Sequence, residues 1–229
     1  MQDTGMGSIA ENIKRLLDGL APGVTVVAVT NTRTVGEAME AYNAGLRIFG
    51  ENRVQELAAK REQLPGDISW HLIGHLQSNK VKPAVASAAM IESVDTVRLL
   101  RLIDAEALAQ GRRIDCLLQV HIASEESKSG FSITEMKATD WGKVASSLKA
   151  ARICGVMGMA TFTDDKEKVR SEFSILTDLF GQLRDVHFSH DSHFREISMG
   201  MTSDWQVAVE EGSTMIRVGT LIFGERFKK

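Results

Sequence analysis

The sequence predicts an α/β fold, a single (β/α)8 barrel of the TIM type preceded by one extra N-terminal helix. Eight short apolar segments are each separated from the next by a segment with helical periodicity. The length of 229 residues is close to the roughly 250 that are typical of this barrel. The alternative, an open doubly wound sheet, carries a glycine fingerprint after its first strand. Residues 30–33 read Thr-Asn-Thr-Arg and contain no glycine, which favours the barrel.

The extra helix begins with a capping-box signature, Ser8 followed three residues later by Glu11. Apolar residues then recur at helical spacing as far as Leu20, and we expect the helix to end at Pro22 and Gly23. The first strand is expected in the β-branched run that follows, a composition typical of a strand buried on both faces.

Beyond this point strands and helices alternate. The predicted strands are at 24–30, 46–49, 69–73, 89–93, 114–122, 152–157, 196–198 and 215–218. The helices are expected at 36–44, 54–64, 80–87, 97–110, 134–150, 165–183 and 203–211. Gly45 is a candidate left-handed cap for the first of them.

Composition restricts the domain count and the partners. Only three prolines occur and no polar linker interrupts the chain, so residues 1–229 are predicted to form one domain. We also expect a monomer. With 27 Lys and Arg against 30 Asp and Glu, the chain lacks the basic field that a nucleic-acid partner requires. No apolar stretch reaches the ~20 residues of a membrane span, and no signal core follows the N-terminus, so we expect a cytoplasmic protein. Cys116 and Cys154 lie in apolar runs and are expected to be reduced and buried.

The strongest candidate site is at the end of the chain. In TIM-type barrels the loops after strands seven and eight often hold a phosphate group through backbone N–H groups. Gly200 and Gly219 allow the backbone to approach a ligand closely, and Thr202 can bond to a phosphate oxygen. The same residues could instead form only tight turns and helix caps. Arg217, inside an apolar strand, requires either a bound anion or a structural ion-pair partner.

Catalytic and metal motifs are not found. His71 and His75 are four residues apart but straddle a strand end, so their geometry does not suit a metal site. His121, near the end of the fifth strand, could face the pocket. Neither a nucleophile elbow nor a Walker-type phosphate loop occurs. We therefore assign no catalytic residue, and enzymatic activity is not expected.

Several segments resemble one known family. These segments are 48–56 (IFGENRVQE), 70–80 (WHLIGHLQSNK), 125–130 (EESKSG), 198–201 (SMGM), 212–220 (GSTMIRVGT) and 222–226 (IFGER). They resemble the pyridoxal phosphate homeostasis proteins, whose barrel is similar to the N-terminal domain of alanine racemase. The resemblance implies cofactor carriage rather than turnover. It also implies a phosphate site in the Ser-Met-Gly-Met loop and the Gly-Thr pair, an arginine facing the pyridine nitrogen, and an asparagine lining the ring pocket. The resulting candidate cofactor-binding residues are Asn31, Asn52, Ser198, Gly200, Met201, Thr202, Arg217, Gly219 and Thr220.

One position departs from the family pattern. The family's Schiff-base lysine belongs at the end of the first strand, in Val-Ala-Val-Ser-Lys-Thr, whereas residues 27–32 read Val-Ala-Val-Thr-Asn-Thr. The match continues without a gap through Ala41 and Gly45, so Asn31 occupies the lysine position. A carboxamide cannot provide the amine that a Schiff base requires, and covalent cofactor capture at this position is not expected.

Three interpretations follow. The pocket could hold pyridoxal 5'-phosphate noncovalently, or a phosphate or sulfate ion in its place. Alternatively, the chain is a natural or engineered variant whose pocket serves another use, such as hydrolysis with Asn31 or backbone amides as oxyanion donors and a nearby histidine as base. In the third interpretation the barrel is an empty scaffold or a partner-binding module. The sequence leaves open whether Lys128 can replace the missing amine.

Overall fold

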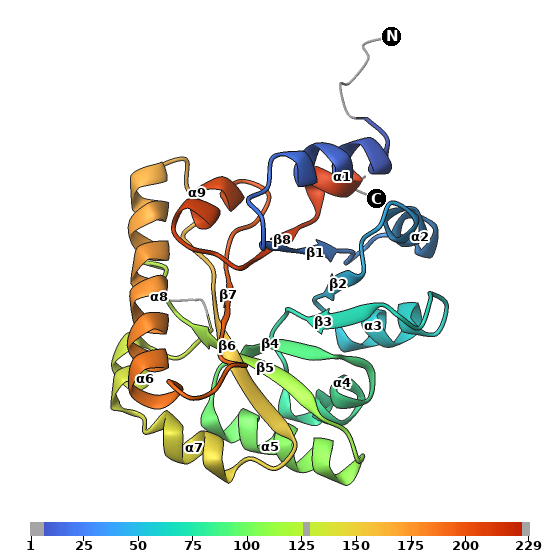
Figure 1. Cartoon of the computed structure of the whole chain (residues 1–229). Helices are drawn as coiled ribbons and strands as arrows, with labels where there is room; N and C mark the ends of the chain where they lie inside the picture. Colours follow the sequence, from blue (N-terminus) through green and yellow to red (C-terminus); the bar gives the residue numbers. More distant parts are fainter. Residues whose placement is uncertain (1–6, 126–128, 226–229) are drawn as a thin grey trace.

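Eight parallel strands form a closed barrel in the computed structural model, which describes residues 7–125 and 129–225 (Figure 1). The strands follow one another around the barrel in chain order, and β8 pairs with β1 to close it. They are β1 (Thr25–Val29), β2 (Ile48–Glu51), β3 (Ser69–Leu72), β4 (Met90–Val94), β5 (Ile114–Val120), β6 (Ala151–Gly158), β7 (Glu196–Ser198) and β8 (Met215–Val218). The barrel prediction is confirmed, and the open sheet was the wrong alternative.

Helices surround the barrel (Figure 1). They are α1 (Ile9–Asp18), α2 (Val35–Asn43), α3 (Val54–Arg61), α4 (Val81–Ser87), α5 (Val97–Ala109), α6 (Ile133–Ala138), α7 (Trp141–Ser147), α8 (Lys166–His187), α9 (Trp205–Glu210) and α10 (Thr220–Phe223), with a 3-10 turn η1 (Ser78–Lys80) before α4. Helix α1 is the predicted extra helix, and its capping box is present. The Asn12 side chain attaches this helix to the end of the chain by donating to the carbonyl oxygen of Ile222 at 3.0 Å.

Several element predictions were wrong in detail; the helix expected at 165–183, for example, continues to His187, and the strand expected at 46–49 is at Ile48–Glu51. The helix expected at 134–150 is two helices, because the backbone of Thr139 is extended and the Asp140 side chain starts α7 by accepting from the N–H of Lys143. Helix α1 ends at Gly19, before the predicted proline. Helix α10 was missed, since four residues are too few to show a helical period.

The barrel interior changes character along its axis. A small apolar cluster, separate from the larger core, is formed by Val27, Met90, Leu117, Cys154, Met157 and Met215. Side chains two residues apart on a strand point to the same face. Glu92 therefore follows Met90 on the inside of the barrel, and Arg217 follows Met215. The interior is thus apolar toward the amino ends of the strands and charged toward their carboxyl ends.

Two further expectations concern cysteines and membranes. Cys116 and Cys154 are both free and buried, as predicted. Burial raises the pKa of Cys154 to about 12, so this thiol is held in its protonated form.

Within residues 7–125 and 129–225, no helix combines the length and the apolar character needed to cross a bilayer.

Candidate functional site

A cavity of about 480 Å³ opens at the carboxyl ends of the strands. Its lining consists of Val29, Asn31, Asn52, Ile73, Met159, Phe162, Met201, Thr202, Ser203, Arg217, Gly219 and Thr220. These residues come from the ends of β1, β2, β3, β6 and β8 and from the loop after β7. Asn31 and Gly219 therefore share one rim, as the strand order predicts. Barrel enzymes and binding proteins place their sites at this face.

Two predicted site residues, Ser198 and Gly200, are outside the cavity lining. Ser198 is fully buried and its hydroxyl is used inside the protein. Gly200 has a left-handed φ of 93°, and a Cβ there would lie 2.6 Å from the Cβ of Ala208. Its carbonyl oxygen accepts from the N–H of Arg217 at 2.9 Å. Both residues therefore support the loop that contains Met201 and Thr202.

The lining of the cavity combines two kinds of residue. Thr202, Ser203 and Thr220 have hydroxyl groups, and Gly219 leaves its backbone uncovered by a side chain. The wall is apolar where Val29, Ile73, Met159 and the 84% exposed Phe162 contribute. Such a cavity can hold a flat apolar ring that carries an anionic group at one end.

Arg217 forms the cationic floor. Its side chain is only 4% exposed. One terminal nitrogen donates to the Ser198 hydroxyl at 2.6 Å, and the other donates to the carbonyl oxygen of Gly158 at 3.0 Å. Burial lowers the pKa of Arg217 below its ordinary value, while the charges of Glu92 and Asp204 oppose this shift.

Glu92 is a functional candidate that the sequence analysis missed. It is fully buried and accepts from the Ser198 hydroxyl at 2.6 Å, while His71 Nδ1 lies 2.7 Å from its second oxygen. Burial alone would raise the pKa of this carboxyl, but His71, Arg217 and Ser198 outweigh it and hold the pKa below its ordinary value. The available signal was a single acidic residue inside an apolar strand, the same signal that singled out Arg217.

A second buried ion pair supports the end of β1. Lys60 on α3 donates to the carbonyl oxygen of Thr30 at 2.5 Å and pairs with a Glu51 oxygen at 2.6 Å. The other Glu51 oxygen is buried and has no hydrogen-bond partner. Burial raises the pKa of Glu51 above its ordinary value, although Lys60 and Thr30 oppose the shift. This cluster fixes the residue directly before Asn31.

The residue after Asn31 is also constrained. Thr32 has φ of 66°, in the left-handed region that a β-branched residue rarely adopts. Its N–H donates to the Glu56 carboxylate at 3.1 Å. Strained backbone of this kind often occurs at functional sites. Asn31 is therefore fixed by partners on both of its sequence neighbours.

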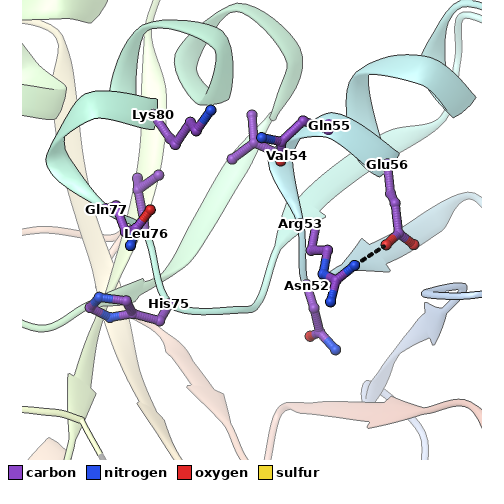
Figure 2. Close-up of a pocket in the computed structure, with 9 residues that line it drawn as sticks. All are labelled: Asn52, Arg53, Val54, Gln55, Glu56, His75, Leu76, Gln77 and Lys80. Carbon is purple, nitrogen blue, oxygen red and sulfur yellow. Dashed lines mark ion pairs between the residues drawn. The ribbon is translucent and has the colours of Figure 1, made fainter.

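Figure 2 shows the residues that line a second cavity. This cavity has a volume of about 520 Å³. It lies between the segment of residues 52–56 and the segment of residues 75–80, and Asn52 belongs to the lining of both cavities. Arg53 pairs with Glu56 at 3.7 Å, and the Arg53 side chain is 78% exposed. His75 pairs with Asp95 at 3.1 Å. The lining of this cavity is about half polar and half apolar, and its Arg53 is already paired and largely in solvent.

Three histidines of the described chain have partners away from the lining of the barrel-mouth cavity. His71 is used by Glu92, His75 by Asp95, and His121 Nε2 lies 2.8 Å from the carbonyl oxygen of Glu125. None of these three lines the barrel-mouth cavity. The described part of the chain contains no cluster of three His, Cys, Asp or Glu residues that could hold a metal ion. Lys128 lies outside the described residues.

Sequence comparison finds relatives over nearly the whole chain. The family profile described as alanine racemase, N-terminal domain, matches residues 6–227. A pyridoxal phosphate homeostasis protein from Aquifex aeolicus is 37% identical over 188 residues, covering 82% of this chain and 80% of its own. The protein of the same name from Synechocystis is 36% identical over 212 residues, covering 90% and 94%.

Solved structures agree with this assignment. PipY of Synechococcus elongatus is 36% identical and covers 95% of this chain and 100% of its own, with a TM-score of 0.89 without pyridoxal phosphate and 0.86 with it bound. An alanine racemase from Clostridium difficile, at 11% identity and a TM-score of 0.81, covers 97% of this chain and 60% of its own and shares the fold. With its closed barrel and its relatives along almost its entire length, this chain belongs to the pyridoxal phosphate homeostasis proteins, within the alanine racemase N-terminal domain family.

Proposed function

We propose that this chain binds pyridoxal 5'-phosphate noncovalently in the barrel-mouth cavity and acts as a cofactor-homeostasis protein without catalytic turnover. The observation that carries the proposal is the cavity itself, whose lining combines hydroxyl-bearing residues and Gly219 with apolar residues and the cation Arg217. PipY, a relative of the same family, has been solved with pyridoxal phosphate bound. The two free, buried cysteines fit a protein that works in the reducing cytoplasm, and we propose that it does so as a monomer.

The residues present fit the noncovalent part of this function. The cavity of about 480 Å³ is within the usual range for small-molecule sites, about 300–1,000 Å³. Thr202, Gly219 and Thr220 would bind the phosphate group, with Met201 in the same loop and with Ser198 and Gly200 supporting it from below. Asn52 would contact the ring, and Arg217 would donate to an acceptor on the ring edge. When bound, the cofactor supplies an aldehyde that reacts with amines.

The residues do not fit covalent capture at the end of β1. Asn31 lines the cavity, and its carboxamide nitrogen is not a nucleophile. Asn31 can hydrogen-bond to the ligand but cannot trap it. We therefore expect weaker and fully reversible binding.

The hydrolase alternative lacks a base. Hydrolysis with Asn31 as an oxyanion donor requires a general base within hydrogen-bond reach of the attacking water. No histidine is among the residues that line the described cavity. His71, the buried histidine nearest in sequence to the rim, is bonded to Glu92. The noncovalent cofactor site is therefore favoured over a repurposed pocket, and its donors and cation favour it over an empty scaffold.

The variant Asn31→Lys tests the site directly. Pyridoxal 5'-phosphate should bind the unmodified chain saturably, and borohydride should fix no adduct at residue 31. Asn31→Lys should gain a reducible adduct of about one per chain, because its amine would project into the same cavity. Absorbance titration followed by peptide mapping of the reduced protein measures both. An adduct on Lys128 of the unmodified chain, or none on Asn31→Lys, would contradict the assignment.

Free phosphate tests the anion cradle independently of the ring. A ligand that binds only the folded state stabilises it by about 2.7 kcal/mol at one hundred times its dissociation constant. Inorganic phosphate in the tens of millimolar should therefore raise the Tm, and sodium chloride of matched ionic strength should not. Equal Tm values in the two salts would show that Thr202, Gly219 and Thr220 do not form an anion site.

A further inference from the structure

Charged and polar groups from four strands meet beneath the barrel-mouth cavity. His71 comes from β3, Glu92 from β4, Ser198 from β7 and Arg217 from β8. All four are buried. Only Arg217 of this group belongs to the cavity lining. The other three therefore reach a bound ligand only through Arg217.

The carboxylate of Glu92 sets the direction of every hydrogen bond in this group. An ionised carboxylate only accepts, so Ser198 must donate its single hydroxyl proton to Glu92 at 2.6 Å, and the facing Nδ1 of His71 must carry a proton. With its proton used, Ser198 can only accept from Arg217, at 2.6 Å. Glu92 itself lies 3.9 Å from the same guanidinium nitrogen.

These bonds orient Arg217. Two acceptors, the Ser198 hydroxyl and the carbonyl oxygen of Gly158, hold its two terminal nitrogens. A guanidinium has five N–H donors in one plane and no acceptor. The floor of the cavity can therefore offer donors and positive charge but nothing that accepts.

We propose that Glu92, acting through Ser198, is a positioning residue that fixes Arg217 and makes the cavity select flat ligands with a hydrogen-bond acceptor, such as an unprotonated ring nitrogen, at the edge facing the floor. This inference rests on the proposed function. Stability alone is a weak reason for the group, because a buried ion pair is often no more stabilising than apolar residues of similar volume. Selectivity gives this arrangement a use that apolar residues could not provide.

The experiment compares two ligands that differ only at the ring edge. Pyridoxal 5'-phosphate carries a ring nitrogen, and its carbocyclic analogue carries a C–H group there. The natural chain should bind the analogue at least about tenfold more weakly, as expected when a hydrogen bond to a charged group is lost. The natural chain should also bind inorganic phosphate, because Thr202, Gly219 and Thr220 would contact a phosphate group with or without a ring attached.

The test variant is Glu92→Met, which is close to glutamate in size and removes both carboxylate oxygens; Glu92→Gln would not serve, because its amide oxygen could still accept from Ser198. Without the carboxylate, the hydroxyl proton of Ser198 is no longer committed to residue 92, so Ser198 no longer has to accept from Arg217. The preference for the ring nitrogen should fall to within about threefold, while phosphate binding stays unchanged. Asp104→Asn is the matched control. The Asp104 carboxylate accepts from the N–H groups of residues 149–151, at the amino end of β6 and away from the cavity.

Each outcome is decisive. If the natural chain binds phosphate but not pyridoxal 5'-phosphate, the proposed function fails. If it binds both ring ligands equally well, or if Glu92→Met keeps the full preference, the positioning role is wrong and the proposed function stands. If Glu92→Met does not fold, Ser198→Ala removes the bridging hydroxyl and should lose the preference in the same way. If Ser198→Ala keeps the preference for the ring nitrogen, the role of Glu92 is overturned. Loss of this preference in the control Asp104→Asn would also overturn it.

Discussion

Lys60→Met should lower the free energy of unfolding by about 3–5 kcal/mol, because it leaves a buried carboxylate without its cation. Glu51 is fully buried, and one of its oxygens already lacks a partner. Removing Lys60 also deprives the carbonyl oxygen of Thr30 of a donor. Urea unfolding followed by circular dichroism measures the loss. Lys14→Met, which removes a solvent-exposed ion pair with Asp18, should change stability by no more than about 0.5 kcal/mol.

The double variant Lys60→Met with Glu51→Gln separates charge from packing. It removes the isolated carboxylate and should recover most of the lost stability. A double variant as unstable as Lys60→Met would show that packing of the lysine stem, not the charge, causes the loss.

The pH dependence of the Lys60→Met defect has a definite sign. Burial already raises the pKa of Glu51 in the natural chain, and loss of the lysine raises it further. Between the ordinary pKa and this raised value, the folded state binds more protons than the unfolded state, so stability falls as pH rises. The defect should therefore be smaller near pH 5 than near pH 8. An equal defect at both pH values would contradict an electrostatic cause.

Gly155→Ala should lower the free energy of unfolding by at least about 3 kcal/mol. Gly155 lies within β6 with φ of 152°, and a Cβ there would lie 1.8 Å from the carbonyl oxygen of Glu196. That atom belongs to the backbone of β7, which pairs with β6 at this position. It cannot move aside without separating two strands. Because β7 ends at Ser198, the loop that lines the cavity should be displaced as well.

Two other glycines serve as controls for this substitution. Gly45 has a left-handed φ of 104°, but a Cβ there would have open space around it. At Gly66 a Cβ would also have open space, and the backbone is not left-handed. Gly45→Ala should cost about 1 kcal/mol from backbone strain alone, and Gly66→Ala should be close to neutral. The order Gly66, Gly45, Gly155 in the measured losses separates strain from steric overlap. A Gly155→Ala loss no larger than that of Gly45→Ala would show that β6 and β7 adjust freely.

Local patterns in the sequence were sufficient to predict the barrel. The strands at 196–198 and 215–218 were predicted with the bounds that the structure shows. Short apolar runs between helical segments are typical of parallel strands buried on both faces, and their short length and β-branched residues distinguish them from buried helices. Order along the chain then places Asn31 and Gly219 at the same rim, because parallel strands have all their carboxyl ends on one side. The absence of an amine at residue 31 is likewise a property of the sequence alone.

The tertiary structure alone decided which charged residues meet. Arg217 was recognised as a cation in an apolar strand, but the sequence does not show that it contacts Ser198, 19 residues away, or that Ser198 contacts Glu92, 106 residues away. The pairing of Lys60 with Glu51 was missed for the same reason, since it depends on the distance between α3 and the end of β2. Periodicity reports which face of an element a side chain occupies, and this follows from the local backbone. Partners across the barrel interior are determined by strand register and barrel closure, which involve residues far apart in the chain.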